Sequence, residues 1–126
     1  MEYKNHANIH DLLNKVFKTV EIKNTDMGDI VIFTTINDEI YVMMHEQEGC
    51  EDVRLESVDN NINILTGHQT LVAEERSGSE WTSYLIGNEE GCCNFRWRGS
   101  SNGYYSESVG IYKVFNKEIM DLIYKD

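Results

Sequence analysis

The residues best suited to bind a ligand gather in one short stretch near the end of the chain. They comprise two arginines, three aromatic residues and four polar or acidic residues: Arg96, Trp97, Arg98, Ser101, Asn102, Tyr104, Tyr105, Ser106 and Glu107. Guanidinium groups match carboxylates and phosphates, and tyrosine and tryptophan offer flat apolar faces with a polar tip. The composition favours a site for an anionic or aromatic group. A well-packed hairpin with an aromatic face is the alternative.

The arginines are distributed unevenly. The chain has only four, and none precedes Arg54. Alternation along a strand places Arg96 and Arg98 on one face, opposite Trp97. Arg76 ends a predicted strand and approaches this pair if its strand is a neighbour. Alternatively, each arginine pairs with a carboxylate, which contributes about 0–1 kcal/mol at a surface and implies no function. Four carboxylates are available for such pairs: Glu74, Glu75, Glu80 and Glu107.

Catalytic and metal-binding patterns are weak. His45 with Glu51 or Glu107 suits general acid–base chemistry, but a single strand histidine also fits a core or rim position. The sequence has no nucleophile elbow, P-loop or glycine-rich dinucleotide fingerprint. The adjacent Cys92 and Cys93 point to opposite faces of a strand and cannot bind one tetrahedral metal as a C-x-x-C pair does. We therefore expect a protein that is not an enzyme, with no metal and no cofactor.

Charge is the strongest feature of the composition. The chain has 22 acidic and 11 basic residues, which gives a formal net charge of −11. A field of this sign repels DNA, whose binding requires neutralised phosphates, so we expect no direct DNA binding. The acidic residues either only solvate the surface or form a face for a basic partner.

Length and hydropathy indicate one compact domain over residues 1–126. A chain of this length can bury a substantial core, and 40% hydrophobic residues are ordinary for a globular protein. No apolar run reaches the length of about 18 residues that a membrane-spanning helix needs. The first residues lack the apolar stretch of a signal peptide. We expect a cytoplasmic protein without membrane contact, and a homodimer is left open.

Helix and strand patterns surround the candidate residues. Helical spacing of apolar residues predicts an N-terminal helix over 9–17, with Asn8 as its cap and Asp11 in the first turn, and a C-terminal helix over 117–125. Asn37-Asp38 and Asn102-Gly103 are hairpin signals, and a single helical turn is expected near 60–65. Alternation predicts eight strands, at 20–23, 29–36, 39–45, 52–58, 70–76, 81–87, 92–98 and 105–115.

The order of these elements indicates an internal repeat. Residues 12–58 and 64–115 would each form a short helix followed by four antiparallel strands, with generic strand periodicity as the alternative. His45 would then be equivalent to Trp97, and Glu51 to Glu107. The predicted fold class is α+β, mainly antiparallel sheet, built from two similar halves with a pseudo-two-fold axis and helices at the rims.

Several segments resemble an uncharacterised domain family of small phage and prophage proteins. The similar segments are Cys50-Glu51-Asp52-Val53, Ala73-Glu74-Glu75, Trp81-Thr82-Ser83-Tyr84 and the run from Trp97 to Val109. The resemblance covers roughly residues 12–115. Glu48, Gly49, Arg98 and Ser100 depart from the family pattern. The resemblance implies a phage origin and one compact domain, and the family brings no established activity.

Together these features predict a small, non-enzymatic phage-type binding protein in the cytoplasm of a bacterial host. The resemblance implies interference with a host process such as bacterial immunity. The first mechanism is an acidic surface that binds the basic surface of a host protein. The alternative is sequestration of a small anionic ligand, such as a signalling nucleotide, by the arginines and aromatic residues around the Ser-Asn-Gly-Tyr-Tyr turn. Arg76, His45 and Glu51 are further candidates for binding the ligand or partner.

Overall fold

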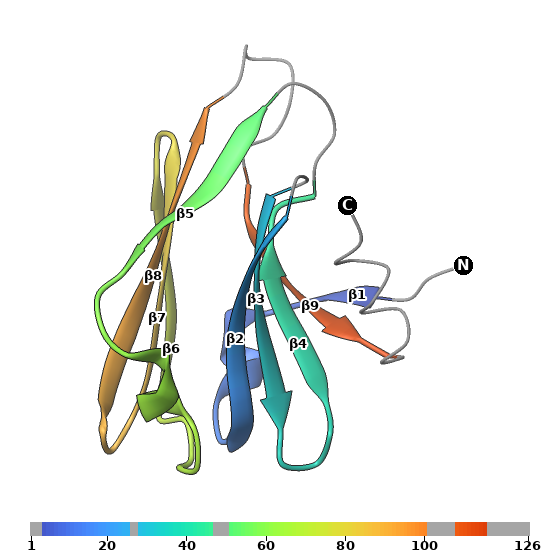
Figure 1. Ribbon diagram of the computed structural model, residues 1–126, viewed down its shortest axis with the longest axis vertical. Coiled ribbons are helices and arrows are strands. Elements are labelled where there is room, and N and C mark those ends of the chain that lie inside the picture. Colours follow the sequence, from blue (N-terminus) through green and yellow to red (C-terminus); the bar gives the residue numbers. More distant parts are fainter. Residues whose placement is uncertain (1–3, 26–27, 47–50, 101–107, 116–126) are drawn as a thin grey trace.

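The computed structural model describes residues 4–25, 28–46, 51–100 and 108–115. Two antiparallel sheets lie face to face with the main core between them (Figure 1). Strands hold 66% of the described residues and helical turns 8%, and no helix there reaches seven residues. The prediction of an α+β fold with helices at the rims is therefore wrong, because the described chain is almost entirely β.

Each sheet has a simple hydrogen-bonding order. The five-stranded sheet contains β1 (Lys4–Ala7), β9 (Gly110–Val114), β4 (Ile40–Met44), β3 (Gly28–Thr35) and β2 (Phe17–Thr25), in that order. The four-stranded sheet contains β5 (Asp52–Val58), β8 (Gly91–Ser100), β7 (Trp81–Asn88) and β6 (Val72–Gly78). All strand pairs are antiparallel. Eight of these strands were predicted from the sequence, β5 at its observed bounds and the others with shifted ends, whereas β1 was not predicted.

Each half of the chain contributes one strand to the sheet that the other half forms. β2, β3 and β4 form one meander, but β5 crosses to the other sheet and pairs with β8. β6, β7 and β8 form the second meander, and β9 crosses back to pair with β4. Each sheet therefore needs a strand from the other half, so neither half completes a sheet alone. The duplication of the sequence itself stays a prediction.

The predicted helix over 9–17 is only a 3₁₀ turn, η1 (Ile9–Leu12). Its start is as predicted, since the Asn8 side chain accepts from the His10 N–H and Asp11 completes the capping box. The turn stops because Leu13 is extended and Asn14 has a φ of 69°. Phe17 then opens β2 and is fully buried. The apolar spacing that suggested a helix belongs to a short turn followed by a strand.

The second helical turn, η2 (Ile62–Leu65), repeats this arrangement. Its cap, Asn61, accepts from the Asn63 N–H as Asn8 does in the first turn, and Leu65 is buried in the core. Gly67 follows with a φ of 83°. An antiparallel bridge between Val16 and Gln69 joins the two connections that follow the turns. The two turns therefore close the same end of the sandwich.

Aromatic rings fill the space between the sheets. The Phe33 ring lies 5.2 Å from that of Phe17 and 5.8 Å from that of Phe95, centroid to centroid. The indole N–H of Trp97 donates to the sulfur of Met43 at 3.2 Å. Contacts of this kind join β8 to β3 and β4 across the sandwich. A second apolar cluster lies on the opposite face of the five-stranded sheet and includes Ile30, Ile32, Ile40, Val42, Tyr112 and Val114.

Two predicted features lie outside the described residues. These are the Asn102-Gly103 turn and the C-terminal helix over 117–125. The hairpin signal at Asn37-Asp38 is confirmed, because these residues join β3 to β4 and Asp38 has a φ of 65°.

Candidate binding site

The structure describes six of the predicted site residues and separates them into two places. Ser101, Asn102, Tyr104, Tyr105 and Glu107 lie outside the described residues. Arg76, Arg96 and Arg98 belong to the four-stranded sheet, and Trp97 lies in the core beneath them. His45 and Glu51 lie at a connection between the sheets.

Alternation along β8 fixes the roles of its residues. Trp97 is 1% exposed and points into the core, where its indole contacts Met43. The neighbouring Arg96 and Arg98 therefore extend from the opposite, outer face of the four-stranded sheet, with side chains 38% and 56% exposed. The predicted opposition of these arginines to Trp97 is confirmed, so Trp97 supports the outer face from beneath.

One carboxylate orients both arginines of β8. The Nε of Arg96 donates to Glu56 Oε1 at 3.1 Å, and the Nε of Arg98 donates to Oε2 at 2.6 Å. Hydrogen bonds from Arg98 and Arg96 lower the pKa of Glu56 below its usual value. The carboxylate partner in the described part of the chain is thus Glu56 of the neighbouring strand β5, and the described candidates Glu74, Glu75 and Glu80 form no ion pair with these two arginines. Glu107 lies outside the described residues. Among the residues that the structure describes, the hydrogen bonds of both guanidinium groups use Nε and leave the terminal nitrogens for other contacts.

Trp81 lies beside Arg96 on the same outer face. The guanidinium carbon of Arg96 is 4.9 Å from the centroid of the Trp81 ring, within the range of a cation–π contact. The indole leans over Gly78 of β6, where an added Cβ would lie 2.4 Å from its nitrogen. Glycine at position 78 therefore makes room for the Trp81 ring and keeps it next to Arg96.

Arg76 lies in the same row of the sheet as Arg96. Ser83 of β7 pairs with Arg76 on one side and with Arg96 on the other. The Ser83 hydroxyl lies 2.6 Å from the side-chain oxygen of Asn94 and is hydrogen bonded to it. Arg76 is exposed and makes no hydrogen bond or ion pair with any residue in the described part of the chain. The guanidinium groups of Arg76 and Arg96 therefore flank the small Ser83, and that of Arg76 has no partner among the described residues.

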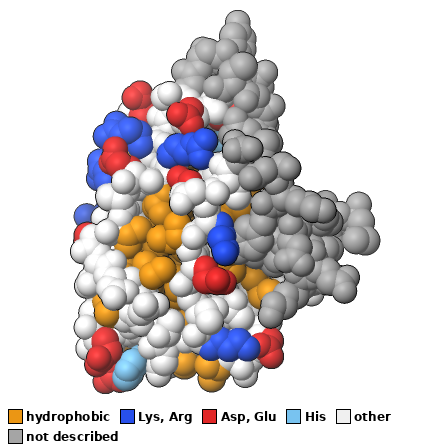
Figure 2. Space-filling view, in the orientation of Figure 1, with side chains coloured by type: hydrophobic (Ala, Val, Ile, Leu, Met, Phe, Trp, Pro, Cys, Tyr) orange, Lys and Arg blue, Asp and Glu red, His pale blue; other side chains and the backbone are white. Residues whose placement is uncertain are grey.

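A hollow of about 450 Å³ occupies this part of the outer face. Four uncharged side chains line it: Trp81, Ser83, Leu85 and Asn94. Four charged side chains also line it: Asp59, Glu74, Arg76 and Arg96. Positive and negative side chains are interleaved at the upper left of Figure 2, on the side of the four-stranded sheet. This surface combines an aromatic ring, cationic donors and carboxylate acceptors within one shallow site.

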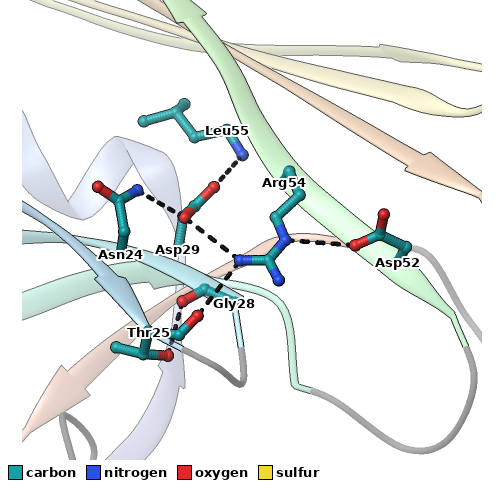
Figure 3. Close-up of polar contacts among 7 residues, drawn as sticks. All are labelled: Asn24, Thr25, Gly28, Asp29, Asp52, Arg54 and Leu55. Atoms are coloured by element: carbon teal, nitrogen blue, oxygen red, sulfur yellow. Dashed lines mark hydrogen bonds and ion pairs between the residues drawn. The ribbon is translucent and has the colours of Figure 1, made fainter.

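The fourth arginine has a structural role. Arg54 pairs in register with Arg98, but its side chain turns over the sheet edge towards the β2–β3 hairpin (Figure 3). There Nη1 donates to the Thr25 carbonyl at 3.2 Å and lies 3.6 Å from the Asp29 carboxylate. Asp29 also accepts the Leu55 N–H of β5 at 2.8 Å. Asp29 and Arg54 therefore hold the edge of one sheet against the other.

His45 and Glu51 form a buried pair away from the arginines. His45 Nε2 and Glu51 Oε2 are 2.8 Å apart, with side chains 5% and 0% exposed. His45 Nδ1 lies 2.6 Å from the Ser108 carbonyl, which can only accept, so this nitrogen carries a proton. The three residues join the β4–β5 connection to the segment that enters β9. Burial removes both side chains from direct contact with a partner.

Several residues of this surface were not predicted from the sequence, above all Trp81, Ser83 and Glu56. A signal for the first two was present, because alternation in 81–85 places Trp81, Ser83 and Leu85 on one face. Their position beside Arg96 depends on the pairing of β7 with β8, which a single sequence does not specify. Glu56 lies at a bulge in β5, where the register shifts between Leu55 and Ser57.

A second, smaller hollow of about 290 Å³ lies at the β6–β7 hairpin. Its lining includes the carboxylates of Glu75 and Glu80 and the hydroxyl groups of Ser77, Thr82 and Ser108. Within the described ranges, no three His, Cys, Asp or Glu side chains are grouped so that they could hold a metal ion. No helix in the described part of the chain has the length and apolar character needed to cross a membrane.

Comparison with known proteins identifies the family. No curated protein and no solved structure matches the chain. Residues 10–111 match the family model described as a domain of unknown function (DUF7448). The prediction that the chain belongs to a domain family of unknown function is confirmed, whereas the phage origin and the family's sequence motifs stay predictions. Because the match covers most of the sequence, the chain belongs to the DUF7448 family.

Proposed function

We propose that this protein is a small, non-enzymatic binding protein and that the outer face of the four-stranded sheet is its contact surface. One observation carries the proposal: Arg76, Arg96 and Arg98 share this face with the half-buried ring of Trp81. Arginine and tryptophan are enriched among the residues that contribute most to binding. Three of only four arginines in a chain of net charge −11 lie here.

The charge of the rest of the chain limits the kind of partner. A strongly negative molecule repels long polyanions, whose many phosphates cannot all reach a few arginines. The surface instead suits a partner that presents one or a few acidic groups next to an apolar or planar group. Such a partner would contact the exposed nitrogens of Arg76 and Arg96 and the ring of Trp81.

The proposed biological setting is interference with a host process, such as bacterial immunity, by a phage or prophage protein in the host cytoplasm. The resemblance of segments such as Trp81-Thr82-Ser83-Tyr84 to phage proteins supports this setting. A binding protein of 126 residues fits the role, because occupying a host factor requires a surface and no catalytic group.

A second candidate is an acidic surface that binds a basic host protein. The hollow at the β6–β7 hairpin favours it, because Glu75 and Glu80 both line this space. Glu51 does not contribute to such a face, because its side chain is buried against His45. The hairpin is therefore the better place for a basic partner. Binding there would weaken steeply with salt, as expected for charge-steered association.

Affinity capture from a bacterial host lysate tests the main proposal. The intact protein is compared with Arg76→Gln/Arg96→Gln, which removes two positive charges from the outer face. Lys18→Gln/Lys23→Gln removes two exposed positive charges from β2 in the other sheet and serves as the matched control. We expect native mass spectrometry to find a host protein or small ligand on the intact protein and on the control. Equal retention by all three proteins would refute the proposal.

A further inference from the structure

We propose that the hollow between Arg76 and Arg96 is a specific site for a small planar molecule that carries a single oxyanion, either a phosphate or a carboxylate. This inference rests on the proposed function, because it names the ligand class for the same face. It goes further because it assigns the oxyanion to the row of Arg76, Ser83 and Arg96. It assigns the planar group to the side chains of Trp81 and Leu85 on either side of that row.

The register of the three strands creates the space for the oxyanion. Arg96, Ser83 and Arg76 are consecutive partners across β8, β7 and β6. Strands in a sheet lie about 4.8 Å apart, so the two arginines are separated by about 10 Å at their Cα atoms. Ser83 is small and 7% exposed, and it forms the floor between them. An oxyanion above Ser83 can accept from both guanidinium groups.

The donors that face this space are available and oriented. Among the described residues, Arg76 has no hydrogen-bonding or ionic partner, so its guanidinium is free to bind. Arg96 uses its Nε for Glu56 and stacks on Trp81, which fixes the side chain, and no residue in the described ranges binds its terminal nitrogens. Binding to an oriented group costs less conformational entropy than binding to a mobile one. Charge-assisted bonds from arginine to an oxyanion are among the stronger hydrogen bonds in proteins.

The planar part of the ligand follows from the neighbours of Ser83 along β7. Trp81 and Leu85 lie two residues to either side and present apolar surface to the hollow. Its volume of about 450 Å³ lies within the usual range of small-molecule sites. A ring that rests against Trp81 would place its attached oxyanion over Ser83, between the two arginines.

The carboxylates at the far side of the hollow limit the charge of the ligand. Asp59 and Glu74 line it together with Asn94, one row away from the arginines. They offset the two arginines and accept hydrogen bonds from amino groups on a ring. They also repel additional phosphates, and the net charge of −11 adds to this repulsion. The site therefore favours a monophosphate or monocarboxylate over a di- or triphosphate.

Titration followed by NMR of the indole N–H signals tests the assignment. The probes are adenosine monophosphate for a phosphate on a planar base and nicotinate for a carboxylate on a planar ring. Adenosine, inorganic phosphate and adenosine triphosphate are the comparison compounds. We expect one of the two probes to shift the Trp81 signal saturably at millimolar concentration, while the signal of the buried Trp97 stays in place. Binding of adenosine monophosphate would identify the oxyanion as a phosphate, and binding of nicotinate would identify it as a carboxylate.

Variants decide whether the site is the one proposed. Arg76→Gln should weaken probe binding about tenfold or more, because it removes a charge-assisted bond from an exposed side chain. Its melting temperature should not change. Lys18→Gln should leave binding unchanged. Absence of a saturable Trp81 shift with both probes, tighter binding of the triphosphate, or equal binding by Arg76→Gln would overturn the inference. If both probes fail but Arg76→Gln/Arg96→Gln still loses the captured host factor, the proposed function stands without this site.

Discussion

The two tryptophans have different roles because their strands place one ring in the core and the other on the outer face. Trp97 points inward from β8 and is 1% exposed, whereas Trp81 lies on the outer face against Arg96. Their neighbours in the sequence look alike, since both lie in alternating strands with polar residues on either side. Only the pairing of the strands and the packing of the sheets assign one ring to the core and the other to the surface.

Replacing each tryptophan by alanine should therefore have different results. Trp97→Ala should lower the free energy of unfolding by about 3–5 kcal/mol, because it leaves a cavity beside Met43. Trp81→Ala should cost about 1 kcal/mol or less and should abolish binding at the outer face. Urea unfolding and the lysate capture measure the two effects. Similar losses of stability in both variants would contradict these positions.

Cys92 and Cys93 offer a second comparison at the level of single residues. Cys92 is exposed, while Cys93 is buried and burial raises its pKa to about 11. The thiolate is the reactive form, so Cys93 should react slowly with a thiol reagent such as an aromatic disulfide at pH 8. In a Cys50→Ser background, we expect one fast equivalent in the native protein and a second only after unfolding. Two fast equivalents without denaturant would place Cys93 at the surface.

Ion pairs at the ends of strands join elements that are distant in the sequence. Glu39, which precedes β4, accepts from Lys15 and from Lys113 of β9, each at 3.0 Å. The bond from Lys15, followed by that from Lys113, lowers the pKa of Glu39, and the bond to Glu39 raises the pKa of Lys15. The pair therefore stabilises the fold between the acidic range where Glu39 is protonated and the alkaline range where Lys15 is neutral.

Glu39→Gln should show this dependence on pH. The pKa of Glu39 is lower in the folded state than in the unfolded state. The ion pairs therefore stabilise the protein above the unfolded pKa of about 4.5, and this stabilisation is lost as the pH falls through the folded pKa. We expect the variant to lose about 0.5–1 kcal/mol at pH 7 and less at pH 3. Melting temperatures at both pH values provide the measurement. A loss that is equal at pH 3 and pH 7 would rule out the ionic contribution.

The connections between the sheets depend on the buried pair of His45 and Glu51. Removal of one partner from such a pair leaves an uncompensated polar group, which costs about 3–5 kcal/mol. His45→Ala and Glu51→Ala should each be destabilising, and the double variant should cost much less than their sum. A double-mutant cycle by urea unfolding measures the coupling. Additive effects would mean that the 2.8 Å contact contributes nothing specific.

At the scale of the whole molecule, local signals predicted the strands but not their arrangement. β5 was predicted at its observed bounds, and the cap at Asn8 and the hairpin at Asn37-Asp38 were also correct. The helix over 9–17 was wrong because the same apolar spacing serves a short turn that ends at Asn14 and then a strand. Sheet order depends on pairs distant in the sequence, such as β5 with β8, which no local pattern reveals.

The candidate site follows the same division between local and distant information. Alternation correctly placed Arg96 and Arg98 opposite Trp97, because it depends on neighbours in one strand. The row that connects Arg96 through Ser83 to Arg76 depends on two strand pairings and was not predicted. Burial of Glu51 was also missed, because its partner His45 lies across a connection between the sheets.

Radical footprinting of tryptophan shows whether the outer face of the four-stranded sheet contacts the partner. Hydroxyl radicals would oxidise the protein alone and the complex captured from a host lysate, with oxidation of each tryptophan read by mass spectrometry. We expect Trp81 to be oxidised in the free protein and protected in the complex, while the buried Trp97 reacts slowly in both. Equal oxidation of Trp81 with and without the bound partner would contradict this contact.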